Sequence, residues 1–366
     1  MVVQQLTALD WAKKAADTLM AQYQPMELPP ANRWHYHQGV FLCGVLDIFH
    51  RTDELHYYAY CKEYVDELID EEGNFYFARS ELDAIQPGLL LLSLYQKTNQ
   101  RKYQIAASKL RHLLNTLNVT KEGGFWHKDK YPYQMWLDGL YMAGPFTVQY
   151  GQLFNEPELT NVVMKQEALM RKHTKKENGL YYHGYDESKQ ALWSTEKGHA
   201  PEVWGRALGW YAMVTTNLIE MFPADHPKRF ELTEVVQQLI KALISFQDEA
   251  TGLWYQVVDK PGGAGNYLES SCSCLFIYAI AKAVQQGYVD ISFLQQAEKA
   301  YQGLLEEKVE LEQQGRFQLH DICIGTSIGT YDYYVERETS TNDLHGVGAF
   351  ILASVQLSRA KREVLG

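Results

Sequence analysis

Residues 101–150 read RKYQIAASKLRHLLNTLNVTKEGGFWHKDKYPYQMWLDGLYMAGPFTVQY, and this stretch contains one complete structural unit. Its first part, Arg101–Leu117, mixes charged and apolar residues with the period of an amphipathic surface helix. A short loop of glycine and aromatic residues follows, and then a cluster of polar and aromatic residues. The last part, Gly139–Tyr150, is apolar nearly all round, which is typical of a buried helix. The stretch therefore predicts a hairpin of one surface helix and one buried helix.

The same unit recurs along the chain. Its loops are EEGNFYF (71–77), KEGGFWH (121–127), ENGLYYHGYD (177–186), ATGLWYQ (250–256) and QGRFQLH (314–320). They are separated by roughly 50 to 75 residues, which suits one helical hairpin per repeat. Surface helices are predicted at Leu6–Tyr23, Asp53–Asp70, Arg101–Leu117, Leu159–Lys175, Phe230–Gln247 and Ser292–Val309. Buried helices are predicted at Gly39–Phe49, Pro87–Tyr95, Gly139–Tyr150, Gly205–Phe222, Ser271–Val284 and Gly346–Val355.

Six outer and six inner helices in alternation predict an all-α fold, the (α/α)6 barrel, as a single domain over residues 1–366. An open α-solenoid is the structural alternative, because a repeat period alone does not show that the ring closes. Chain direction places every outer-to-inner connection at the same end of the barrel. We therefore expect the glycine and aromatic loops and the N-termini of the inner helices to meet at one mouth. Helix N-termini carry partial positive charge, which favours a bound carboxylate.

Composition excludes several classes of protein. A formal charge of −11 without a Lys/Arg-rich tract argues against a nucleic-acid partner. The five cysteines form neither a disulfide framework nor a zinc-binding spacing. No apolar run reaches the length of a membrane span, and charged residues interrupt the N-terminal segment where a signal peptide is apolar. We expect a cytoplasmic protein with no membrane partner, present as a monomer or a weak homo-oligomer.

Aromatic residues point to a carbohydrate ligand. The chain has 25 Tyr and 8 Trp, many of them beside Gly and His in the loops, although large aromatic residues also fill protein cores. Aromatic faces stack on the C–H surfaces of sugars, while phenol and indole groups form hydrogen bonds with hydroxyls.

Two aspartates occupy equivalent places in neighbouring repeats. Asp138 stands in MWLDGLYM at the start of an inner helix, and Asp83 stands in ELDAIQPG one repeat earlier. Both residues are candidates for acid/base work, or one of them holds a sugar hydroxyl and raises the pKa of the other. We expect the flanking indole and a buried setting to raise the pKa of Asp138. The simpler alternative for either residue is a helix N-cap.

Further candidates come from the same mouth segments. The segment VWGRALGW offers Trp204, Arg206 and Trp210, and a fixed guanidinium suits a uronate carboxylate, although a structural salt bridge is the alternative for Arg206. His127 and His183 are either ligand contacts or structural histidines. No nucleophile elbow, phosphate-binding loop or dinucleotide motif is present, so we expect no cofactor and no metal.

Five stretches in this order carry a resemblance: WHYHQG (34–39), GGFWHKDKYPYQMWLDGLYMAGPF (123–146), YYHGYDES (181–188), HAPEVWGRALGWYAM (199–213) and GNYLESSCSCLFIYAIAKA (265–283). Together they resemble the unsaturated rhamnogalacturonyl hydrolases of glycoside hydrolase family 105. The resemblance implies an (α/α)6 barrel without a metal, which hydrolyses small unsaturated oligosaccharides from pectin by hydrating a double bond. It assigns the acid/base role to Asp138. It also implies that the unsaturated sugar is bound by Tyr36, Asp83, His127, His183, Trp204, Arg206 and Trp210.

Three alternatives stay open at this point. An unsaturated glucuronyl hydrolase acting on glycosaminoglycan fragments resembles this family in fold and chemistry, although a sulfated leaving group favours a more basic mouth. A sugar epimerase on the same barrel needs a pair of histidines flanking the substrate. A helical-repeat interaction scaffold presents its binding residues along a concave face, whereas here the unusual residues gather at one end.

Overall fold

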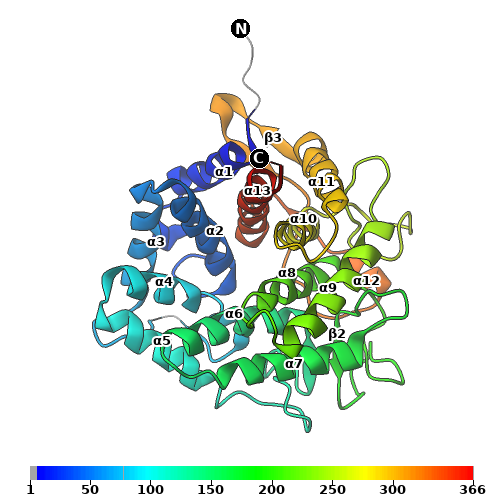
Figure 1. The fold of residues 1–366 in the computed structure, drawn as a ribbon, viewed down its shortest axis with the longest axis horizontal. Coiled ribbons are helices and arrows are strands. Elements are labelled where there is room, and N and C mark those ends of the chain that lie inside the picture. The colour runs from blue at the N-terminus through cyan, green and yellow to red at the C-terminus, as the bar shows by residue number, and fades with distance from the viewer. Residues whose placement is uncertain (1–5, 77, 366) are drawn as a thin grey trace.

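The structure is a computed structural model that describes residues 6–76 and 78–365, and helices make up most of it. Outer helices alternate with inner helices along the chain (Figure 1). The outer helices are α1 (Ala8–Gln22), α3 (Leu55–Leu68), α5 (Arg101–Leu113), α7 (Leu159–Thr174), α9 (Pro227–Ser245) and α11 (Leu294–Glu307). The inner helices are α2 (Tyr36–Thr52), α4 (Gly88–Thr98), α6 (Leu137–Leu153), α8 (Gly205–Ile219), α10 (Ser270–Gln285) and α13 (Leu344–Leu365).

The burial of each helix follows its sequence pattern. Outer helix α5 buries Tyr103, Ala106, Ala107 and Leu110, which lie on one face at helical spacing. Inner helix α8 buries every residue except Asn217. A helix that is apolar all round needs other helices on all sides, so the inner helices form the core and the outer helices shield it.

The inner helices close into a ring. Each packs against the next along the chain, and α13 packs against both α10 and α2, so the last inner helix meets the first (Figure 1). Small residues allow this approach: a Cβ on Gly348 of α13 would lie 2.6 Å from the backbone nitrogen of Phe41 in α2. The prediction of an (α/α)6 barrel is confirmed, and the open solenoid is wrong because the ends of the array are in contact.

The loops that follow the outer helices share one turn. Gly73, Gly123, Gly179, Gly252 and Gly315 all have positive φ, which glycine adopts without strain. In three of the loops an antiparallel bridge encloses this glycine, at Ile69–Phe75, Val119–Phe125 and Lys175–Tyr181. The repeated glycine therefore reverses the chain after an outer helix and sends it across the mouth.

The two ends of the barrel differ in their connections. At one end, residues 53–54 and 99–100 are enough to join α2 to α3 and α4 to α5. At the mouth, the connections are long and contain most of the remaining regular structure. This consists of strands β1 (Gln134–Trp136) with β2 (Gly184–Asp186), β3 (Val309–Leu311) with β4 (Phe317–Leu319), and β5 (Ile322–Cys323) with β6 (Thr339–Ser340), all antiparallel. The mouth also contains the short helices η1 (Pro25–Glu27), η2 (Leu82–Ala84), η4 (Gln313–Gly315) and α12 (Tyr331–Val335), whereas η3 (Ile291–Phe293) lies at the opposite end.

The inner helices are apolar but short or interrupted by polar groups. Among residues 6–76 and 78–365, none of the helices has both the length and the apolar character that crossing a bilayer requires.

Candidate active site

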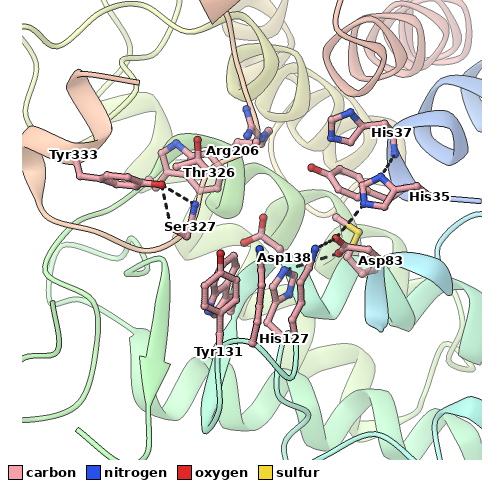
Figure 2. Close-up of a pocket in the computed structure, with 17 residues that line it drawn as sticks. His35, His37, Asp83, His127, Tyr131, Asp138, Arg206, Thr326, Ser327 and Tyr333 are labelled. Carbon is pink, nitrogen blue, oxygen red and sulfur yellow. Dashed lines mark hydrogen bonds and ion pairs between the residues drawn. The ribbon is translucent and has the colours of Figure 1, made fainter. Parts of the chain in front are cut away.

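A cavity of about 320 Å³ opens at the mouth of the barrel. Segments that are distant in sequence supply its walls (Figure 2). The lining residues are His35, Tyr36, His37, Asp83, His127, Lys128, Lys130, Tyr131, Trp136, Asp138, Met142, Trp204, Arg206, Gly325, Thr326, Ser327 and Tyr333. Six of the residues singled out from the sequence therefore meet in one place: Tyr36, Asp83, His127, Asp138, Trp204 and Arg206.

Asp138 lies in the first turn of α6 and faces the cavity. Its exposed fraction is 7%, so the carboxyl is poorly hydrated without being sealed off. It is not the N-cap of α6, because Trp136 occupies that position and forms no side-chain capping bond. Since Asp138 is not the capping residue, its cavity-facing carboxyl is available to a ligand.

Backbone pairing brings His183 to Asp138. Strand β1 pairs with β2, and the N–H of Leu137 donates to the carbonyl of His183 at 3.0 Å. This places Nε2 of His183 3.2 Å from Oδ2 of Asp138. His183 itself is fully buried behind the cavity wall, so it reaches a ligand through Asp138 or at the edge of its ring.

Tyr334 fixes the tautomer of His183. The Tyr334 hydroxyl lies 2.7 Å from Nδ1 of His183, and it accepts a hydrogen bond from the N–H of Gly329 at 3.2 Å. When this hydroxyl donates its proton to Nδ1, His183 carries its ring proton on Nε2, which faces the carboxylate of Asp138.

The pKa of Asp138 is lowered, which corrects the expectation from the sequence. Burial does raise the pKa of this carboxyl, but the contact with His183 and the electrostatic interaction with the His183 and His127 imidazoles outweigh burial. Reasoning from the neighbouring indole was incomplete because it omitted the histidine that arrives from another repeat. In the protein without a ligand, Asp138 is therefore ionised at neutral pH.

Asp83 has a different set of partners. Its carboxylate forms an ion pair with Lys128 and lies 3.5 Å from Nε2 of His35 and 3.8 Å from Nε2 of His127. Burial raises the pKa of Asp83, but these partners together hold it well below its ordinary value. Asp83 thus stays an acceptor of hydrogen bonds and does not donate a proton near neutral pH.

His127 lies against the indole of Trp136, with ring centroids 4.1 Å apart and nearly parallel planes. Burial lowers the pKa of His127 to about 4, so its ring is neutral in the pH range of the cell. A neutral imidazole in this position is suited to hydrogen bonding with hydroxyls.

Arg206 is buried without a carboxylate partner among the described residues. Its guanidinium donates to the carbonyls of Cys323 and Ile324 and lies over the ring of Trp204, with Cζ 4.5 Å from the ring centroid. The structural salt bridge considered from the sequence does not form. Two fixed carbonyls and an indole hold the group rigidly, and its positive charge suits an anionic ligand.

Trp210 does not line the cavity. It lies one helical turn below Arg206 in α8 and stacks on Tyr141, with ring centroids 4.4 Å apart. Arg206 and Trp210 are four residues apart and therefore lie on one face of α8. Because Trp210 is one turn further from the mouth, its indole packs in the core.

Several buried polar atoms of the site have no hydrogen-bond partner of good geometry within residues 6–76 and 78–365. They are Oδ1 of Asp83, Nδ1 of His127, Oδ2 of Asp138, Nε2 of His183 and Nε1 of Trp204. Leaving such groups unsatisfied is costly, so a ligand with several hydroxyls would offset that cost on binding.

The sequence did not single out the segment 325–333, which supplies Gly325, Thr326, Ser327 and Tyr333 to the cavity. This segment lies in the connection from α11 to α13, and all such connections meet at the mouth. Its position was therefore implied by the chain direction. Its polar and aromatic composition was the available signal for a role in the site.

Comparison with known proteins defines the class. A family model described as Glycosyl Hydrolase Family 88 matches residues 11–361, so the fold and the site together are those of a glycoside hydrolase. The chain belongs to this family, and the resemblance to family 105 is confirmed by a solved structure, a family 105 glycoside hydrolase from C. acetobutylicum ATCC 824. That structure is 34% identical, has a TM-score of 0.90, and covers 95% of this chain and 99% of its own.

Curated relatives include two that match long parts of the chain. Protein Atu3128 of Agrobacterium fabrum is 35% identical over 226 residues, which is 58% of this chain and 96% of the relative. The unsaturated rhamnogalacturonyl hydrolase YesR of Bacillus subtilis is 27% identical over 251 residues, 66% of this chain and 68% of the relative. The unsaturated glucuronyl hydrolase of Bacillus sp. GL1, at 13% identity with a TM-score of 0.71 over 96% of both chains, shares the fold.

Proposed function

We propose that this glycoside hydrolase removes an unsaturated uronic acid residue, the 4-deoxy-hex-4-enuronosyl (galacturonyl) group, from small pectin-derived oligosaccharides with rhamnose as the leaving sugar. The observation that carries the proposal is a poorly hydrated carboxyl, Asp138, facing the cavity at the mouth beside a buried guanidinium that has no carboxylate partner among the described residues. The relative named as an unsaturated rhamnogalacturonyl hydrolase supports the choice of substrate.

The cavity suits a short substrate. Its volume of about 320 Å³ is near the lower end of the range for small-molecule sites, about 300–1,000 Å³. The substrate carboxylate is anchored by Arg206, and the ring hydroxyls bond to Asp83 and His127. Trp204 and Trp136 provide flat faces for the sugar.

Substrate binding reverses the protonation state of Asp138. In the free protein the pKa of Asp138 is lowered by His183. The bound uronate expels water and brings a negative charge close to the carboxyl, and both effects raise a carboxyl pKa. Asp138 therefore gains a proton as the substrate enters, which makes it a general acid only when an anionic substrate is present.

The reaction begins at the double bond. Asp138 protonates C4, which leaves oxocarbenium-like positive charge on C5 and the ring oxygen. Water adds at C5, and its proton passes to the Asp138 carboxylate, so that the acid is regenerated. The resulting hemiketal opens at the bond between C5 and the ring oxygen, and the hemiacetal left at C1 releases the saturated sugar with a 4-deoxy-5-keto-uronate as the other product.

This route differs from ordinary glycoside hydrolysis, which places one acid at the glycosidic oxygen and a second carboxylate across the anomeric carbon. Here one carboxyl both gives and takes the proton. Asp83 is held ionised by Lys128 and serves binding, which agrees with a single acid/base.

The test is spectroscopic. Hydration of the double bond abolishes the ultraviolet absorbance of the conjugated enol ether, so wild-type protein should remove this absorbance from an unsaturated galacturonyl-rhamnose disaccharide. Asp138→Asn should lower kcat by about 10²–10⁴-fold, the usual contribution of general acid/base catalysis. An unchanged thermal unfolding midpoint in the variant is the control for folding.

Two results would contradict the proposal. Loss of only a few-fold in Asp138→Asn would remove Asp138 from the acid/base role. The second result is faster turnover of an unsaturated glucuronyl disaccharide from a glycosaminoglycan than of the galacturonyl-rhamnose disaccharide. It would show that rhamnose is not the preferred leaving sugar, while the proposed chemistry would still hold.

A further inference from the structure

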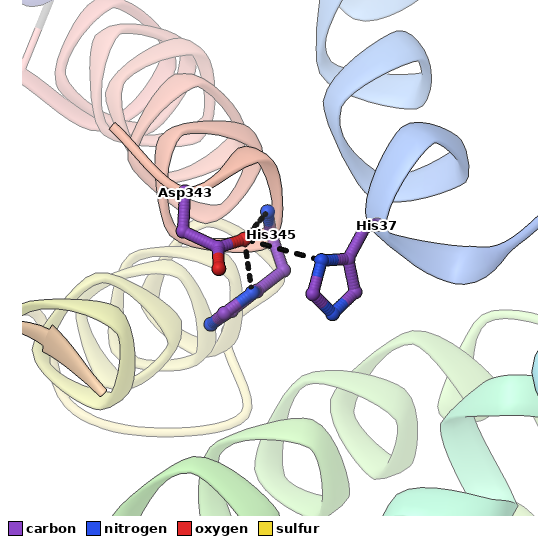
Figure 3. Close-up of side chains that lie close together, drawn as sticks. All are labelled: His37, Asp343 and His345. Carbon is purple, nitrogen blue, oxygen red and sulfur yellow. Dashed lines mark hydrogen bonds and ion pairs between the residues drawn. The ribbon is translucent and has the colours of Figure 1, made fainter. Parts of the chain in front are cut away.

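A second polar cluster lies in the wall of the cavity, where the ring of inner helices closes. His37 comes from the first turn of α2, and Asp343 and His345 stand at the start of α13 (Figure 3). Oδ1 of Asp343 lies 3.2 Å from Nδ1 of His37 and 2.7 Å from Nδ1 of His345. These three atoms all lie within 4.8 Å of one another.

His345 is not satisfied by this arrangement. Its side chain is fully buried, yet neither ring nitrogen has a hydrogen bond of acceptable geometry. Nδ1 lies 2.7 Å from Oδ1 of Asp343, whereas Nε2 of the same ring has no hydrogen-bond partner among the described residues. A buried imidazole with an unpartnered nitrogen calls for a further partner.

The donor set defines what that partner is. Two imidazole nitrogens and one carboxylate oxygen form a three-ligand site for a divalent transition metal, with the remaining positions left to water. His37 and Asp343 keep 16% and 18% of their side chains exposed, so water has access from the cavity side.

We propose that His37, Asp343 and His345 bind one divalent transition-metal ion, with Zn²⁺ as the reference ion. The ion fastens the first inner helix to the last one at the mouth. It is separate from the proton transfer assigned to Asp138, so the site stands whether or not the proposed reaction is correct. This inference departs from the expectation, drawn from the sequence, that the protein has no metal.

The primary experiment measures metal binding directly. Protein dialysed against EDTA and then against metal-free buffer is titrated with ZnCl₂, and bound zinc is measured by equilibrium dialysis. We expect one zinc per chain, a rise in the unfolding temperature on adding zinc, and visible absorption bands of a bound ion when Co²⁺ replaces Zn²⁺. All three should be lost in His37→Gln and His345→Gln.

A matched control separates this site from a second cluster nearby. His35, Glu81 and Asp83 also lie close enough to share an ion, but Lys128 already pairs with Asp83. His35→Gln should therefore bind zinc like the wild type. Zinc binding that survives in both His37→Gln and His345→Gln, or that is lost only in His35→Gln, would overturn the proposal, as would the absence of binding in the wild type.

His345→Gln changes a fully buried residue, so its folding needs a check. His37→Gln changes a partly exposed residue and keeps the test decisive if His345→Gln does not fold. Activity is not needed as a readout, because stoichiometry and the cobalt spectrum report the ligands themselves.

Discussion

Two buried aspartates come from neighbouring hairpins, Asp83 from η2 just before α4 and Asp138 from the first turn of α6, and they meet different partners. Asp83 contacts a lysine and two histidines, whereas Asp138 contacts a single histidine that approaches from the next repeat. A carboxylate paired with a lysine is fixed in its charge, and one whose ion-pair contact is an imidazole responds to a bound anion. The difference in partners assigns binding to one acid and proton transfer to the other.

Asp83→Asn tests the first of these assignments through stability. The pKa of Asp83 is depressed in the folded state, so its contribution is present above the unfolded value near 3.9 and is lost as pH falls toward the folded value. Removing one partner of a buried ion pair costs about 3 kcal/mol at neutral pH. Urea unfolding should therefore show a destabilised variant whose stability falls less between about pH 5 and pH 2 than that of the wild type. Parallel curves for the two proteins would contradict this.

His183→Leu tests the second assignment through the pH profile. The contact with His183 lowers the pKa of Asp138, so its removal should raise that pKa. Because Asp138 must carry a proton to protonate C4, activity falls as pH rises through this pKa. The alkaline limb of the kcat profile should move to higher pH in His183→Leu.

Tyr334→Phe is the graded companion to that variant. It keeps the imidazole and removes only the hydroxyl at Nδ1, so the limb should move in the same direction by a smaller amount. An alkaline limb that stays in place in both variants would show that His183 does not tune the acid.

The sequence predicts those site residues whose positions follow from the helical repeat. Asp138 and Arg206 stand in the first turns of inner helices and Asp83 lies in η2 just before α4, so the repeat alone sends them to the mouth. The contact between His183 and Asp138 could not be predicted, because it depends on β1 pairing with β2 across two hairpins. The sequence also did not show that Trp210 lies too far along α8 to line the cavity. Periodicity predicts which face of a helix a residue occupies but not whether that part of the face reaches the cavity.

Among the elements, the glycine turn that follows five of the six outer helices carries the repeat. Gly73 has φ +66°, and a Cβ there would lie 2.7 Å from the backbone nitrogen of Ala106 in α5. The turn therefore requires glycine for two reasons: its positive φ and its close approach to the neighbouring hairpin.

Gly73→Ala and Gly262→Ala separate these two requirements. Gly262 also has positive φ, at +71°, but nothing lies within 4 Å of a Cβ placed on it. Its replacement should cost about 1–2 kcal/mol, the conformational penalty alone. Gly73→Ala should cost clearly more, because the backbone of α5 cannot move aside. Equal shifts in the unfolding midpoint would mean that the close contact carries no cost.

The helices themselves were the most predictable part of the molecule. The predicted starts at Arg101, Leu159 and Gly205 coincide with those of α5, α7 and α8. The apolar pattern of a helix extends over many residues, so it can be recognised in the sequence. Ends were less accurate, as in α5, which stops at Leu113 instead of Leu117. The two-residue and three-residue strands were not predicted, because such short pairs leave no alternating pattern.

For the molecule as a whole, stability depends on the seam between α2 and α13. Gly44 and Gly348 let the two helices approach across it, and a Cβ on Gly348 would meet backbone atoms of Val40 and Phe41. Neither partner helix can shift without disturbing its other neighbour in the ring.

Gly348→Val should therefore destabilise the entire barrel. Overpacking at a rigid contact costs about 3 kcal/mol, and the loss should appear as one lowered cooperative transition in thermal unfolding. Gly325→Ala serves as the control, because a Cβ at Gly325 meets nothing within 4 Å. Retention of wild-type stability in Gly348→Val would show that the seam is loose.

The unequal connections at the two ends of the barrel bear on how such a protein diversifies. Links at the first end range from two residues, at 53–54 and 99–100, to eight residues, at 286–293. At the mouth, the same helices are joined by long connections, and each connection can lengthen, shorten or be exchanged separately. The preference for the leaving sugar can therefore change when a connection such as residues 308–343 is replaced, while the helices of the barrel stay the same.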